Sequence, residues 1–123
     1  MKKISFRKFE HMILPRFRQR SNKAESIEDI RKAFISSILD LFEKALGGRV
    51  VVGYEDVDFR PYERPYFFIS ERLLGDDYVL SMWKDSDIRQ TVERLAQTAM
   101  NRYKHLEKHC EKTNAKIRMN VFR

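Results

Sequence analysis

The sequence predicts an α+β domain, in which an antiparallel sheet of four or five strands carries two long helices. Two segments have apolar residues at helical spacing, and several short segments are rich in β-branched and aromatic residues. The length of 123 residues fits one hydrophobic core. The expected order is arm, helix, three strands, helix and strand, with a basic N-terminal arm at residues 1–23 and a globular domain at residues 24–123.

The first helix is predicted at residues Ile27–Leu46. Ser26 is a suitable N-cap, and the acidic Glu28 and Asp29 follow in the first turn, where the helix dipole favours them. The pair Gly47-Gly48 predicts a left-handed C-terminal cap. The apolar side chains cover an arc of about 180°, wider than the ~100° stripe of a helix with one neighbour. We therefore expect this helix to pack against more than one surface.

Three strands are expected next, at residues 49–54, 66–70 and 78–83. The turn-forming segment 74–77 lies between the last two, which favours an antiparallel hairpin. In these two strands the apolar residues follow one another directly, so both faces are apolar. Helices are expected to cover one face of the sheet and a second partner the other.

A long second helix is predicted to begin after Asp85-Ser86, either of which can cap it. Apolar residues recur on one face from Ile88 to Cys110, over a helix of about 36 Å. Thr113-Asn114 is expected to end the helix. The alternation of polar and apolar residues over 116–121 predicts a C-terminal strand with one face in water.

Positive charge is concentrated in the arm. Residues 1–23 contain eight Lys and Arg and one acidic residue, Glu10, whereas the remaining chain has 17 basic and 17 acidic residues. Such segregation indicates a polyanion, an acidic protein or an anionic membrane as partner. The conformation of the arm stays open. Its aromatic residues recur at helical spacing, but Pro15 interrupts that spacing, and a short strand near residues 3–6 followed by irregular chain is the alternative.

These observations predict a non-enzymatic assembly or adaptor module that binds a protein partner or forms a homodimer. The apolar area exceeds what one small core is expected to absorb, and a symmetric dimer would bury the excess. A monomer with the arm folded over the open face is the alternative. The expected binding residues act through charge, as aromatic anchors, or as a second surface. The residues expected to act through charge are Lys2, Lys3, Arg7, Lys8, Arg16, Arg18 and Arg20. The expected aromatic anchors are Phe6, Phe9 and Phe17, and the expected second surface consists of Phe59 and Tyr62.

Nucleic-acid binding through the same arm is the alternative function. Its cations would release counterions from phosphates, and its phenylalanine rings offer faces on which bases could stack. The predicted order contains no helix-turn-helix, and strand 66–70 lacks the glycines of an RNA-recognition motif. Membrane-surface binding is disfavoured because Pro15 interrupts the apolar stripe.

No catalytic residue, metal site or cofactor is predicted. His105 and His109 are four residues apart and share a helix face, but Glu107 is not where zinc proteases place their glutamate, and Cys110 lies on a different side of the helix. A solvated helix flank explains the two histidines without a metal.

The acidic run 55–58 and the later carboxylate Glu71 could hold a metal ion, but Arg72 and Leu73 follow Glu71 where a metal nuclease needs a lysine. Gly47-Gly48 follows a helix, whereas a phosphate loop precedes one. The single cysteine excludes a disulfide scaffold and suits a reducing compartment. The apolar run 12–14 is too short for a signal peptide or a membrane span. We expect a soluble cytoplasmic protein without a transmembrane segment.

Overall fold

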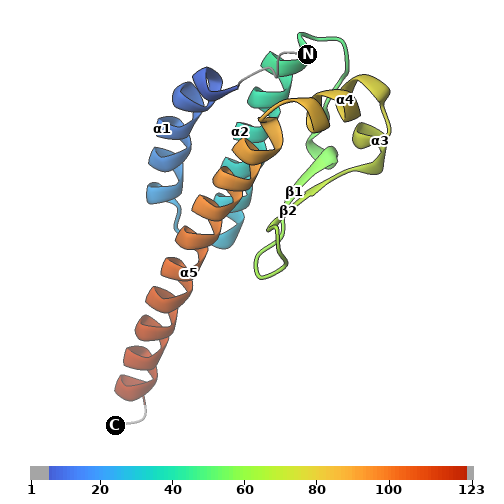
Figure 1. Ribbon diagram of the computed structural model, residues 1–123. Helices are drawn as coiled ribbons and strands as arrows, with labels where there is room; N and C mark the ends of the chain where they lie inside the picture. Colours follow the sequence, from blue (N-terminus) through green and yellow to red (C-terminus); the bar gives the residue numbers. More distant parts are fainter. Residues whose placement is uncertain (1–5, 122–123) are drawn as a thin grey trace.

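The computed structural model describes the backbone of residues 6–121 and the side chains of residues 6–108. Most of this part is helical, and the three longest helices lie side by side (Figure 1). The C-terminal part of the last helix extends beyond the others. The elements are α1 (Arg7–Lys23), α2 (Ile27–Leu46), the single 3-10 turn η1 (Tyr54–Asp56), β1 (Val57–Phe59), β2 (Phe67–Ile69), α3 (Glu71–Leu74), α4 (Asp77–Asp85) and α5 (Ile88–Val121).

The predicted α+β fold with a sheet of four or five strands is wrong. Within residues 6–121 the sheet consists of two antiparallel strands, β1 and β2, with Asp58 opposite Phe68. Of the other predicted strands, residues 49–53 belong to no strand and Tyr54 begins η1. Residues 78–83 lie inside α4, and residues 116–121 lie inside α5. The predicted helix at Ile27–Leu46 is confirmed, with Ser26 as its N-cap.

Helix capping by Asp76 explains why residues 78–83 are not a strand. Its carboxylate accepts hydrogen bonds from the N–H groups of Tyr78 (3.0 Å) and Val79 (3.2 Å), which starts α4. Val79 and Met82, three residues apart, then both face the core, and Trp83 packs against its edge. The apolar residues that predicted a strand therefore form the buried side of a helix.

The N-terminal segment is helical through most of its length, as α1. Pro15 lies inside this helix on the exposed side. A proline removes one N–H donor and leaves a carbonyl of the preceding turn without its helical partner, and on the exposed side water can take the place of that donor. The helical alternative for residues 7–23 is thus the correct one.

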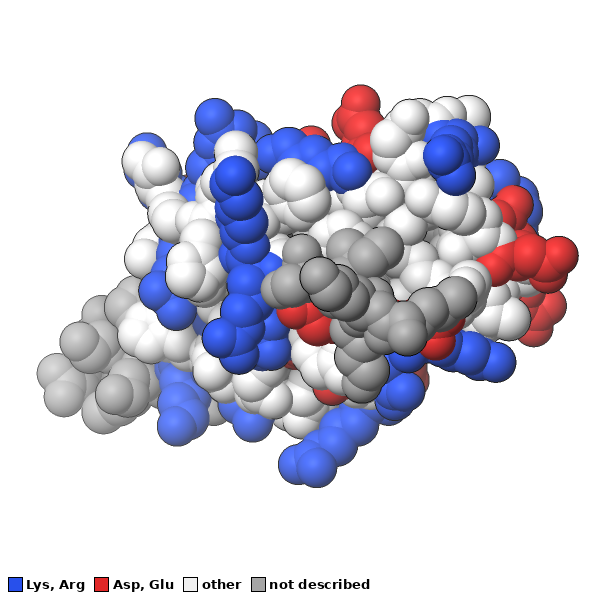
Figure 2. Space-filling model, turned by 45° about the horizontal axis from the view of Figure 1, so that its top comes forward, with Lys and Arg blue, Asp and Glu red and all other residues white. Residues whose placement is uncertain are grey.

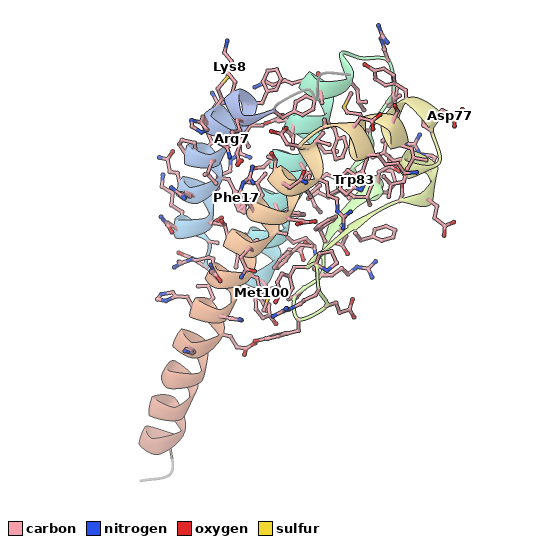
Figure 3. All side chains as sticks on the ribbon, viewed as in Figure 1. Arg7, Lys8, Phe17, Asp77, Trp83 and Met100 are labelled. Atoms are coloured by element: carbon pink, nitrogen blue, oxygen red, sulfur yellow. The ribbon has the colours of Figure 1, made fainter. Side chains whose placement is uncertain are left out.

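One core joins α1 to the rest of the chain. Phe17 of α1 contacts Phe34 of α2 edge-on, with ring centroids 6.4 Å apart; Phe34 in turn contacts Phe59 at 5.8 Å, and Phe59 contacts Tyr103 of α5 at 6.3 Å. Phe17 and Met100 point into the space between the helices (Figure 3). The β1–β2 hairpin and α4 close the other side of α2.

Candidate interaction surface

Helix α1 has a buried side and a cationic side. Glu10, Ile13, Phe17 and Ser21 recur at three- and four-residue spacing and are buried. Figure 2 shows Lys and Arg gathered on the side of this face that carries α1, and a group of Asp and Glu at the opposite edge, near α3 and α4. The exposed basic residues of α1 include Lys8, Arg16, Arg18, Arg20 and Lys23.

Two arginines of α5 hold α1 in place. Arg94 donates from Nε and from Nη2, each at 2.7 Å, to the carboxylate of Glu10, which is 6 % exposed. The hydrogen bond to Glu10 raises the pKa of Arg94. Arg102 donates to the carbonyl oxygens of Ser21 (2.7 Å) and Asn22 (3.0 Å), which lie in the last turn of α1. The one acidic residue of the segment is therefore used internally, and its cations stay on the surface.

Replacing Arg102 by alanine is expected to lower the free energy of unfolding by about 1–2 kcal/mol, because carbonyl groups at the end of α1 lose a charged donor. Urea denaturation followed by far-UV circular dichroism measures this loss. The matched control is Lys104→Ala, an exposed position on the same helix, for which a change within about 0.5 kcal/mol is expected. Equal losses in both variants would contradict the capping role.

The described arginines fall into two groups. Outside α1, those other than Arg64 have a carboxylate, carbonyl or aromatic partner: Arg31, Arg49, Arg60, Arg72, Arg89, Arg94 and Arg102. On α1, by contrast, Arg16, Arg18 and Arg20 have no ion-pair or hydrogen-bond partner among residues 6–108. Arginine is well suited to forked contacts with carboxylates and phosphates. A cluster of unused arginines on one helix therefore marks a candidate binding surface.

A groove runs between α1 and α2 and brings two of these arginines, Arg16 and Arg20, together with apolar side chains. Its volume is about 280 Å³, and its residues are Met12, Ile13, Arg16 and Arg20 from α1 and Ser37, Asp40 and Lys44 from α2. Met12 is 55 % exposed although it is apolar. A neighbouring hollow closer to the α1–α2 turn adds Lys23 and Lys32 to the same side. The groove thus combines an apolar floor with a cationic rim.

The residues predicted to bind through charge are mostly where a partner can reach them. Lys8, Arg16, Arg18 and Arg20 are exposed on α1. Arg7 is exposed in the first turn of α1 and already interacts within the molecule. Lys2 and Lys3 lie outside the described residues.

The predicted aromatic anchors are placed differently. Phe6 and Phe17 are buried, and Phe9 is half-buried and stacked on Phe6 at 5.9 Å. Phe59 is fully buried, while Tyr62 is exposed. The buried rings stabilise the core and offer no free face to a base or to a partner, because the apolar stripe of α1 faces α2 and α5.

The predicted binding residues did not include the apolar residues Met12 and Ile13 of the groove, nor the cations that α2 supplies, which are Lys44 in the groove and Lys32 in the neighbouring hollow. Lys32 and Lys44 lie on the polar side of the predicted helix at Ile27–Leu46, and a helical projection places both outside its apolar arc. Their proximity to α1 depends on how α1 and α2 pack against each other, and the projection of a single helix gives no information on that packing.

No metal site is assigned. Among residues 6–108 no group of three or more His, Cys, Asp or Glu side chains is close enough to hold an ion. His105 is exposed, and Glu107 accepts a hydrogen bond from the Tyr62 hydroxyl at 2.8 Å. The side chains of His109 and Cys110 lie outside the described part of the chain.

The acidic run 55–58 contains a structural carboxylate, Asp56. It accepts hydrogen bonds from the Gly53 N–H (2.7 Å), the Ser70 hydroxyl (2.6 Å) and the Arg72 guanidinium. Burial alone would raise the pKa of Asp56, but these hydrogen bonds outweigh burial and lower the pKa to about 2. Asp56 therefore ties η1 to the start of α3 and is not available as a metal ligand.

Comparison of the chain with family models, curated proteins and solved structures finds no match. Among the described residues, no helix has the length and apolar character that a membrane crossing requires.

Proposed function

We propose that this protein is a non-enzymatic assembly module that binds an acidic protein surface through the groove between α1 and α2. The observation that supports this most is the contrast between the partnered arginines of the body and the three unpartnered arginines of α1. Solvated arginines cost little to leave unpaired, and each gains a charge-assisted hydrogen bond when a carboxylate arrives.

The lining of the groove favours a protein over a nucleic acid. Met12 and Ile13 supply apolar contact area beside Arg16 and Arg20, a mixture that is common in protein interfaces. Asp40, on the same groove, can accept a hydrogen bond from a donor group of a protein partner, whereas a phosphate backbone offers only acceptors. Base stacking has little support, because Phe6 and Phe17 are buried.

The test is fluorescence anisotropy with the full chain and two labelled probes, poly-L-glutamate and a short DNA duplex. Wild-type protein is expected to bind poly-glutamate, and a variant with Arg16→Gln, Arg20→Gln and Lys44→Gln is expected to lose about tenfold or more in affinity. The matched control removes the same charge elsewhere, through Arg49→Gln, Arg60→Gln and Arg89→Gln, and should bind within about twofold of wild type.

Two outcomes would overturn the proposal. In the first, the control variant loses as much affinity as the groove variant, which would mean that binding depends on the net charge of the protein and not on the groove. In the second, the duplex binds more tightly than poly-glutamate, and its affinity falls about a thousandfold between ~50 and ~200 mM salt, which would make nucleic-acid binding the function.

A further inference from the structure

The outward side of α2 separates two grooves of opposite charge. On the α1 side lies the groove already described, with Arg16, Arg20 and Lys44 at its rim. On the other side a second groove of about 530 Å³, here called the valine groove, lies between α2 and the extended segment after it. The residues of the valine groove are Ser36, Leu39, Asp40, Glu43, Gly48, Val50, Val51 and Val52.

The valine groove has an exposed apolar wall. Val51 is 79 % exposed, more than any other large apolar residue among residues 6–108. Val50 and Val52 pack against the core, so the alternation of an extended chain turns Val51 outward. The segment is held in place, since Arg72 donates to the Val51 carbonyl at 2.9 Å and the Gly53 N–H is bound by Asp56. This wall is an ordered apolar surface, and such surfaces mark interaction sites.

The rim of the valine groove is acidic. Asp40 and Glu43 are both exposed, and neither has an ion-pair partner among the described side chains. The outward side of α2 is therefore flanked by two different surfaces. One carries unpaired cations beside the exposed Met12, and the other carries unpaired carboxylates beside the exposed Val51. Each groove has the chemistry that the other would bind.

The two grooves also lie at the same height along α2, because Asp40 is part of both. A two-fold axis parallel to α2 exchanges its two sides and preserves height, so it brings the arginine groove of one copy onto the valine groove of the other. A two-fold axis perpendicular to α2 would instead oppose arginines with arginines, which is unfavourable. Only the parallel arrangement satisfies both charge and height.

We propose that a second copy of this chain occupies the groove, in a symmetric dimer whose two α2 helices run parallel. Arg16 of each copy faces Glu43 of the other, and Val51 of each copy packs near Met12 of the other. This inference rests on the proposed function, for which it names the acidic partner. A face formed by α1, α2 and the valine segment, each about 10 Å wide along the roughly 30 Å of α2, is near the ~800 Å² per partner of a stable interface.

The experiment is a charge exchange, measured by sedimentation equilibrium of the full chain. Wild-type protein is expected to be dimeric at micromolar concentration, and poly-glutamate is expected to compete with the second copy for the groove and shift the dimer towards monomer. Arg16→Glu alone and Glu43→Lys alone should each raise the dimer Kd by about tenfold or more, because both symmetric contacts then oppose like charges. In an equimolar mixture of the two variants both contacts again join opposite charges, so the mixed dimer should return to within about threefold of the wild-type Kd.

Arg18→Glu is the matched control, because Arg18 lies two residues from Arg16 on the same helix but outside both grooves. It should leave the dimer Kd within about twofold of wild type. Far-UV circular dichroism verifies that each variant is folded.

The dimer inference is overturned by a monomeric wild type, by a dimer that neither substitution weakens, or by a mixture that stays monomeric. A monomeric wild type that still binds poly-glutamate through Arg16 and Arg20 overturns the dimer alone and leaves the proposed function standing. A wild type that neither dimerises nor binds poly-glutamate overturns both.

Discussion

Replacement of Phe17 by alanine is expected to lower the free energy of unfolding by about 3–5 kcal/mol. Phe17 is fully buried and contacts Phe34, so alanine would remove a ring from the centre of the core and leave a cavity between α1 and α2. Urea denaturation followed by far-UV circular dichroism measures the loss. Arg18→Ala, the exposed neighbour on the same helix, is the control and should change stability by no more than about 0.5 kcal/mol.

This comparison also tests how the N-terminal segment relates to the rest of the chain. A flexible arm would tolerate Phe17→Ala as well as Arg18→Ala, and a loss below about 1 kcal/mol would contradict the packing of α1 described above. A large loss would mean that residues 1–23 cannot be removed without exposing Phe34 and the neighbouring core.

Replacement of Asp56 by asparagine is expected to cost about 2–3 kcal/mol at neutral pH. Asp56 is buried and accepts hydrogen bonds from Gly53, Ser70 and Arg72. An amide has one oxygen where the carboxylate has two, and its NH₂ group would face a donor. Arg72 would also lose the charge that it pairs with. The same urea titration measures this effect.

The stabilisation by Asp56 should depend on pH in a defined direction. Its pKa is lowered from an ordinary value of 3.8 to about 2 in the folded protein, so folding favours the ionised form. The resulting stabilisation, about 2 kcal/mol, is fully present above about pH 4 and is lost as the pH falls through about 2. The stability difference between wild type and Asp56→Asn should therefore shrink over that range.

Asp77→Asn is the control for the pH titration, because Asp77 is exposed in the first turn of α4. Its stability difference from wild type should stay small, within about 0.5 kcal/mol, at each pH. A difference between wild type and Asp56→Asn that stays constant from pH 5 to about pH 2 would contradict the role given to Asp56.

Local signals in the sequence were sufficient for α2 and for the start of α5. Ser26 and Gly47 cap α2 at the predicted ends, with Gly47 at φ 59° in the left-handed region. Both helices have apolar arcs too long and regular to be strands. The basic side chains of α1 that the structure describes are exposed, because charged groups on the polar side of a packed helix remain in water.

Local signals failed where a short apolar run fits two structures. Residues 78–83 have β-branched and aromatic side chains, but their three- and four-residue spacing also fits a helix, and the cap supplied by Asp76 favours the helix. The end of α5 was misplaced because Thr113-Asn114 weakens a helix without ending it.

The sequence by itself determined that this chain has one core, where α2 and α5 begin, and that its net positive charge lies near the N-terminus. Only the tertiary structure decided which side of that segment is accessible. The rings of Phe6 and Phe17 are buried in the core, and Arg94 forms an ion pair with Glu10. Arg16 and Arg20 line a groove together with Lys44 of α2. The physical reason is that burial and pairing depend on contacts between residues far apart in the chain, whereas helix caps and apolar periodicity depend on neighbours within a few residues.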